Sequence, residues 1–223
     1  MKKWLVAIMS AALLVFAAGC VRVQYDIELN KDGTATLGGI FALNAEYFSE
    51  EDLSNEDGNE VQHYTFDGTD YIGYDISKEF ESYDELSEYL VENEEEGSSL
   101  FEDAEITIDK GLFSTTYTFD ATTVNLAGES TEGEDSYDAS SMYKVMINLT
   151  MPGKVTELEG GEQNDDGVIE FEFNPSGVNE YHAVSKSTNV VAIVITIVVI
   201  VAVLVAAGLV CLKVLGKKKE QNI

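Results

Sequence analysis

The chain has 223 residues, 45% of them hydrophobic, which is enough for one sizeable domain, or for a small domain plus membrane segments. Its 13 Lys and Arg against 41 Asp and Glu give a formal net charge of −28. This charge argues against nucleic acid as a direct partner, because phosphate binding needs basic patches. Two cysteines are too few for a disulfide framework or a cysteine-rich metal site.

The first 19 residues have the pattern of a bacterial export signal, in which a basic start precedes an apolar run from Trp4 to Phe16. The next four residues, Ala17-Ala18-Gly19-Cys20, resemble a lipobox, the processing site of lipoprotein signal peptides, although Leu is usual where Ala17 stands. The resemblance implies that residues 1–19 are removed and that Cys20 is lipidated, with palmitate among the expected acyl groups. The alternatives are an ordinary signal peptide or an uncleaved anchor.

A second apolar segment lies near the C-terminus, where Val190–Leu212 contains 23 residues without a charge. At 1.5 Å per residue a helix of this length reaches ~34 Å, enough to cross a hydrocarbon core of ~30 Å. The alternative, a buried core helix, fits this length and composition less well. Lysines in the tail at 213–223 predict a cytoplasmic C-terminus. Residues 20–187 would then form an extracytoplasmic domain, anchored to the cell membrane by lipid and by a single-pass helix.

Alternating apolar and polar residues predict β-strands between the two membrane segments. Turns are expected at Asn30–Gly33, Lys110–Gly111 and Pro152–Gly153. The predicted strands cover residues 21–29, 34–43, 105–109, 113–119, 143–151, 169–173 and 181–185.

Two helices are expected among these strands. Ser82 and Glu85 form a capping box for an amphipathic helix over residues 83–94, and acidic residues favour a shorter helix at 50–54. The acidic, Gly- and Ser-rich stretch at 125–141 is expected to be a mobile loop, and residues 92–99 another loop. The pattern predicts an α+β fold: an antiparallel β-sheet domain with one or two helices.

The predicted extracytoplasmic part is strongly acidic. Residues 20–189 carry seven Lys and Arg against 40 Asp and Glu, a formal net charge of −33. Such a surface keeps a domain soluble and away from anionic lipid headgroups. We expect its stability to rise with added NaCl or calcium, since cations screen the repulsion.

Short motifs spread over most of the chain resemble lipoproteins of the LppM domain family, named for a mycobacterial protein. A tryptophan expected near residues 168–173 is absent, and residues 44–140 contribute nothing to the resemblance. The motifs are the lipobox, the turn Asn30–Gly33, the strand end Met151-Pro152-Gly153, the loop with Gly160-Gly161, the strand Val168–Phe173 and the segment Ala183–Ser185 before the membrane helix.

The resemblance implies a double-anchored envelope lipoprotein with a compact α+β domain. The mycobacterial relative is associated with surface exposure and with binding of lipid or glycolipid. For this chain, the resemblance therefore implies a class of function, without naming residues that contact a ligand.

Catalytic signatures are absent from the sequence. It contains no H-E-x-x-H, no G-x-S-x-G and no G-x-x-x-x-G-K-[ST] motif. The stretch Gly128–Gly133 has the wrong spacing for a nucleophile elbow. His63 and His182 lack paired cysteines and are expected to be satisfied polar residues on strands. We therefore predict no enzyme activity and no cofactor.

The segment around the first turn resembles the first half of a calcium-binding loop. Glu28, Asn30, Asp32 and Gly33 imitate the start of an EF-hand loop, but Gly39 stands where the bidentate Glu is required. No specific metal ligands are therefore predicted, although weak cation binding at the acidic loops stays plausible.

Two functions of different classes remain open. In the first, the domain is a non-enzymatic binding module whose sheet and helix enclose an apolar groove for a lipid or glycolipid, lined by Tyr and Phe residues between 64 and 119. The simpler alternative for these aromatic side chains is that they form the core. In the second, the domain is an accessory or scaffold piece that docks another envelope protein through a flat patch or an unpaired strand edge.

Overall fold

The structure is a computed structural model that describes residues 19–53, 60–92, 100–125 and 143–220. Within these ranges the chain forms two β-sheets, the short 3-10 helix η1 (Glu50–Asp52) and the helices α2 (Tyr83–Glu92) and α3 (Val190–Glu220). The predicted signal before Gly19 and nearly all of the two loops predicted at 92–99 and 125–141 lie outside the described residues.

The larger sheet has seven strands, and its order is β3-β4-β2-β1-β7-β10-β9. β1 pairs antiparallel with β2 and parallel with β7, so the sheet is mixed, whereas the other strand pairs follow the predicted antiparallel pattern. Its strands are β1 (Val21–Leu29), β2 (Ala35–Asn44), β3 (Gln62–Phe66), β4 (Thr69–Phe80), β7 (Tyr143–Thr150), β9 (Gly161–Gln163) and β10 (Ile169–Phe171).

The smaller sheet has four antiparallel strands in the order β5-β6-β11-β8. The turn predicted at Lys110–Gly111 joins its first two strands, which confirms the hairpin. Its strands are β5 (Phe101–Lys110), β6 (Ser114–Thr123), β8 (Lys154–Glu159) and β11 (Glu180–Thr188).

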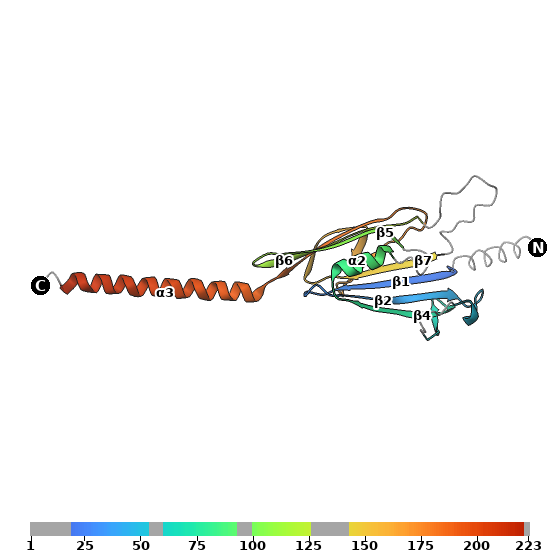
Figure 1. The fold of residues 1–223 in the computed structure, drawn as a ribbon, viewed down its shortest axis with the longest axis horizontal. Helices are drawn as coiled ribbons and strands as arrows, with labels where there is room; N and C mark the ends of the chain where they lie inside the picture. The colour runs from blue at the N-terminus through green and yellow to red at the C-terminus, as the bar shows by residue number, and fades with distance from the viewer. Residues whose placement is uncertain (1–18, 54–59, 93–99, 126–142, 221–223) are drawn as a thin grey trace, which may run out of the picture.

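The core lies between the inner faces of the two sheets. Ile27 and Leu149 of the larger sheet belong to the same buried cluster as Phe119 and Ala183 of the smaller one. Leu86 of α2 (Tyr83–Glu92) joins this cluster, because α2 lies against β5 and also contacts β2 and β4. Figure 1 shows α2 beside β5. The predicted α+β fold is confirmed, with two sheets around one main core.

The two predicted helices of the domain begin where their caps place them. The N–H of Glu85 donates to Oγ of Ser82 at 3.1 Å, as the capping box requires. The carboxylate of Glu85 accepts from the N–H of Glu81 at 2.8 Å, so the reciprocal bond is shifted by one residue. The helix expected at 50–54 is the 3-10 turn η1 (Glu50–Asp52) in the described residues, with its capping box at Ser49.

The hairpin of β3 and β4 is a feature that the sequence analysis missed. Asp67 and Gly68 both have positive φ, 52° and 83°, which is the geometry of a type I′ turn. An Asp-Gly pair flanked by alternating apolar residues is a hairpin signal. The alternation in β4 is hidden by the aromatic Tyr71 on the outer face and by Lys78 on the inner face.

Helix α3 (Val190–Glu220) follows β11 after the single residue Asn189. The side chain of Asn189 caps it, since Oδ1 accepts from the N–H of Ala192 at 3.1 Å. Val190–Gly208 is the one stretch of the described residues long and apolar enough to cross a membrane, and none of it is buried. The helix continues to Glu220, so the predicted basic tail begins within it.

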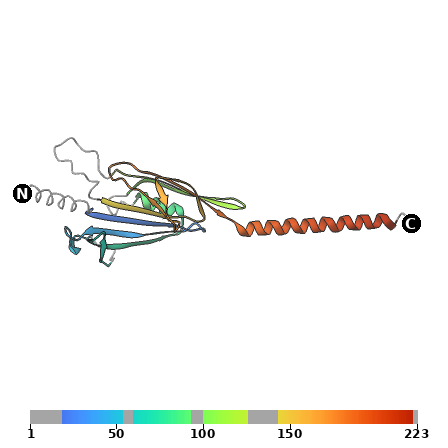
Figure 2. The same ribbon diagram turned by 180° about the vertical axis from the view of Figure 1, so that it is seen from behind.

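The first strand and the apolar helix lie at opposite ends of the domain. β1 begins at the end away from α3 in both views (Figures 1 and 2). The hydroxyl of Tyr117, three residues from the start of β6, lies 3.5 Å from the carbonyl oxygen of Lys31 in the turn after β1. The start of β1 is therefore separated from the α3 end by nine strand residues, roughly 30 Å.

Candidate functional site

Cys20, the predicted lipidation site, lies directly before β1. Its carbonyl oxygen accepts from the N–H of Asn44 at 2.9 Å. The hydroxyl of the buried Tyr71 donates to the carbonyl oxygen of Gly19 at 3.0 Å. Both residues of the predicted cleavage site are thus held against the sheet, with no linker between Cys20 and the domain. Lipidation of Cys20 stays a prediction.

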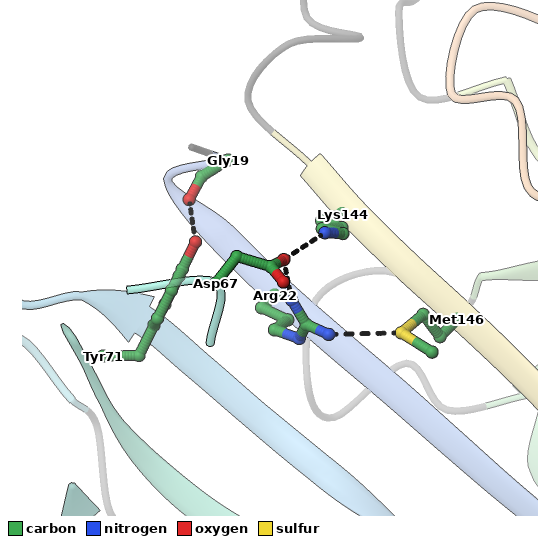
Figure 3. Close-up of polar contacts among 6 residues, drawn as sticks. All are labelled: Gly19, Arg22, Asp67, Tyr71, Lys144 and Met146. Atoms are coloured by element: carbon green, nitrogen blue, oxygen red, sulfur yellow. Dashed lines mark hydrogen bonds and ion pairs between the residues drawn. The ribbon is translucent and has the colours of Figure 1, made fainter. Parts of the chain in front are cut away.

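A cluster of charged side chains covers the outer face of the larger sheet beside Cys20 (Figure 3). The guanidinium carbon of Arg22 lies 4.0 Å from the ring centre of Phe66, and Nη2 is 3.3 Å from Sδ of Met146. Nζ of Lys144 on β7 lies 3.0 Å from Oδ2 of Asp67, and this pair lowers the pKa of the Asp67 carboxyl. The β3–β4 turn therefore contacts β1 through Arg22 and β7 through Lys144.

A second group of polar side chains lies further along the same face. Oδ1 of Asp26 accepts from the side-chain amide of Asn148 at 2.7 Å, and Nε2 of Gln24 lies 3.1 and 3.0 Å from the two carboxylate oxygens of Asp26. Beside Asn148 of this group is a partly open hollow of about 190 Å³, lined in part by Met146, Asn148, Glu162 and Glu170. Carboxylates accept hydrogen bonds and amides both donate and accept, so this group matches a ligand rich in hydroxyls.

Sequence reasoning did not single out this polar group. The alternation along residues 21–29 and 143–151 already predicts that Asp26 and Asn148 point away from the core. Their proximity depends on the parallel pairing of β1 with β7, in which Asp26 is the partner of Asn148. No local pattern encodes a pairing between residues so far apart in the chain.

The aromatic residues expected to line a groove mostly fill the core. The side chains of Tyr83, Phe101 and Phe119 are at most 4% exposed and belong to the main buried cluster. Tyr64 and Phe66 instead stack on the outer face, with ring centres 5.9 Å apart. The hydroxyl of Tyr64 donates to Asp75, and burial and this contact raise its pKa to about 12. The core interpretation is confirmed for the buried aromatic side chains.

Both histidines lie on strands, as expected, and each faces a carboxylate. Nε2 of the exposed His63 is 3.4 Å from Glu50. Nδ1 of His182 is 2.6 Å from Oδ1 of Asp120, and this hydrogen bond raises the pKa of His182. The two histidines belong to different sheets and share no partner among these contacts.

The residues that imitate a calcium loop form a hairpin turn. The N–H of Gly33 donates to the carbonyl oxygen of Asn30 at 3.1 Å. Oδ1 of Asp32 accepts from the N–H and hydroxyl of Thr34 at 3.1 and 2.8 Å, and these bonds lower its pKa. In the described part of the chain, no three His, Cys, Asp or Glu side chains are grouped so that they could hold a metal ion.

The β5–β6 turn carries one correction. A strand was expected over residues 113–119, but its first residue, Phe113, lies in the turn before β6 and is 44% exposed. Its carbonyl oxygen accepts from the N–H of Asn189 at 2.8 Å, so the turn is fixed at the base of α3.

Comparison with known proteins gives a family match and a structural match. A family model described as the LppM domain matches residues 22–187. The NMR structure of the folded domain of the Mycobacterium tuberculosis LppM protein matches with a TM-score of 0.44 and 15% sequence identity, covering 77% of this chain and 92% of that chain. A search of curated proteins found no match.

Proposed function

The chain belongs to the LppM domain family, and from this premise we propose that it is a membrane-anchored, surface-exposed bacterial lipoprotein whose extracytoplasmic domain is a non-enzymatic binding module. The ligand is a lipid or glycolipid. In this proposal Cys20 carries the lipid anchor, α3 crosses the cell membrane once, and the C-terminus is cytoplasmic.

The observation that carries the proposal is the polar group beside the hollow on the outer face. Asn148 lines the hollow together with the apolar side chain of Met146, and its amide is bonded to Asp26 of the neighbouring β1, whose carboxylate also lies near the amide of Gln24. A ligand site of this kind combines an apolar surface with a few positioned polar groups. The hollow is too small for an acyl chain, so it supports recognition of the headgroup.

The charge of the domain supports a neutral headgroup. Glu162 and Glu170 line the hollow, and the whole domain carries a formal net charge of −33. A phosphate would be repelled there, whereas sugar hydroxyls can donate hydrogen bonds to carboxylates. A glycolipid with an uncharged sugar headgroup therefore fits this face best.

The scaffold alternative draws less support from the strand edges. β5 is an edge strand of the smaller sheet, and strand edges can pair with another chain. Its exposed side chains include Glu102, Asp103 and Glu105, and charges on an edge strand act against such pairing. Docking of an envelope protein is therefore the second candidate function, and the experiment below distinguishes it from ligand binding.

Native mass spectrometry of the full chain in detergent tests the proposal after incubation with membrane lipid extract. We expect a glycolipid adduct on the wild type, and binding weaker by about tenfold in Asn148→Ala, because Asp26 loses its amide partner. Asp75→Asn is the matched control, since Asp75 lies on β4 of the same face and bonds Gln62 and Tyr64 away from the hollow.

A bare mass of the wild type after this incubation would contradict the ligand. An equal abundance of the adduct on the wild type and on Asn148→Ala would show that the ligand binds somewhere other than the hollow. A protein cross-linked to the domain in cells, together with a bare mass, would favour the scaffold alternative.

A further inference from the structure

Two adjacent apolar side chains project from the turn between β5 and β6. Leu112 is 70% exposed and Phe113 is 44% exposed. The turn is closed by a hydrogen bond of 2.9 Å from the N–H of Gly111 to the carbonyl oxygen of Ser114. The apolar pair therefore stands on an ordered hairpin.

This hairpin ends beside the first turn of α3. The N–H of Asn189 donates to the carbonyl oxygen of Phe113, and Thr188 pairs with Ser114 in the β6–β11 ladder. Figure 1 shows the hairpin of β5 and β6 reaching towards the start of α3. The exposed apolar pair is therefore level with the point where the apolar helix begins.

Basic side chains gather at the same end of a very acidic domain. Lys186 pairs across the ladder with Lys154, and Lys110 is the last residue of β5, next to the turn. Lys31 lies in the turn whose carbonyl oxygen is 3.5 Å from the hydroxyl of Tyr117, and Tyr117 is the ladder partner of Ile108 on β5, two residues before Lys110. These four exposed lysines are four of the seven basic residues of the domain.

We propose that this end is a membrane-contact surface, in which Leu112 and Phe113 insert into the outer leaflet of the bilayer that α3 spans. Apolar side chains bind the boundary of headgroups and acyl chains, and nearby lysines are attracted to anionic lipids. With the lysines towards the membrane, most of the carboxylates are held away from it. The inference rests on the proposed function in one respect, that α3 crosses the membrane. It departs from it in another, because an upright domain holds Cys20 roughly 30 Å from this bilayer, so a lipid on Cys20 is not inserted in it.

The proposal sets the depth of each end of the domain. Phe113 lies in the bilayer interface, while the opposite end of the smaller sheet lies in water. Val178 marks that opposite end, because its neighbour Asn179 accepts from the N–H of Thr123 at the far end of β6. Val178 is 57% exposed and is therefore a matched exposed position.

Tryptophan quenching in vesicles of brominated lipid tests the proposal. The sequence contains one tryptophan, so the full chain with Trp4→Phe offers a background for single tryptophans. Phe113→Trp probes the turn, Val178→Trp the far end and Leu204→Trp the helix. We expect lipids brominated near the carbonyl end of the acyl chain to quench Phe113→Trp by about half and Val178→Trp hardly at all.

The helix probe separates this inference from the proposed membrane crossing. If Leu204→Trp is quenched by lipids brominated near the chain terminus but Phe113→Trp is not quenched, α3 crosses and the contact surface is wrong. If neither is quenched, the membrane crossing fails and the contact surface fails with it. Equal quenching of Phe113→Trp and Val178→Trp would also overturn the proposal, because the domain would then lie flat.

Discussion

His182 lies between carboxylates of the two neighbouring strands of the smaller sheet. Asp120 on β6 is 2.6 Å from Nδ1, Glu157 on β8 is 4.0 Å from Nε2, and Glu159 is the ladder partner of His182. The hydrogen bond to Asp120 is the largest cause of the raised pKa, and the three negative charges add to it. The folded domain therefore favours the imidazolium form.

This raised pKa predicts a pH dependence of stability. The imidazolium stabilises the fold fully below the unfolded-state pKa of about 6.5, and this contribution is lost as the pH rises through the folded-state pKa. We expect the wild type to lose stability relative to His182→Asn as the pH rises above about 6.5, because Asn can donate to Asp120 without titrating.

Urea denaturation of both proteins across this range measures the difference, and an NMR titration of His182 measures the pKa directly. A folded-state pKa at or below that of a free histidine would contradict the prediction.

At the scale of the element, β2 depends on a glycine opposite Tyr25. Gly39 has a φ of +146°, and a Cβ there would lie 1.9 Å from the carbonyl oxygen of Gln24 on β1. At its neighbour Gly38, the nearest atoms to an added Cβ are 3.8 Å away, which is ordinary contact. The two adjacent glycines therefore differ in what a methyl group would meet.

We expect Gly39→Ala to destabilise the domain by at least about 2–3 kcal/mol, because backbone of β1 or β2 must move, and Gly38→Ala to stay within about 1 kcal/mol of the wild type. The midpoint of urea unfolding of the full chain in detergent, followed by near-UV circular dichroism, gives both values. Equal midpoints for the two variants would show that β2 does not need its glycine at 39.

The elements also show how far alternation alone predicts a fold. Residues 21–29 and 143–151 were predicted as strands because five apolar side chains alternate in each, and the structure confirms both. β8 was missed because its six residues carry only Val155 and Leu158 as apolar side chains. The strands of the outer-face polar group were predicted, whereas the parallel register that brings Asp26 to Asn148 was not.

At the scale of the whole molecule, the charge predicts that ionic strength controls stability. The domain carries a formal net charge of −33, and in the described part of the chain the ion pairs of lysine and arginine are those of Asp67 with Arg22 and Lys144. The Debye screening length falls from ~30 Å at 0.01 M salt to ~8 Å at 0.15 M, so repulsion between distant carboxylates weakens over this range.

We therefore expect the Tm of the full chain in detergent to rise by several degrees as NaCl is added over the same range. Differential scanning calorimetry at fixed pH measures the change. A Tm independent of salt would mean that charge repulsion does not lower the stability of the fold. If the rise in Tm disappeared in His182→Asn, the salt effect would come from this one residue and not from the net charge of the domain.

The placement of Cys20 and α3 at opposite ends has a mechanical consequence. A pull between these two predicted attachments acts along the strands, and β1 is bonded on both sides, by nine residue pairs to β2 and eight to β7. β11 is likewise bonded on both sides, by β6 and β8. Tension along such strands loads all the rungs of a ladder at once, whereas a pull across them opens the rungs one by one. The strands of the domain therefore resist a stretching force applied between Cys20 and α3.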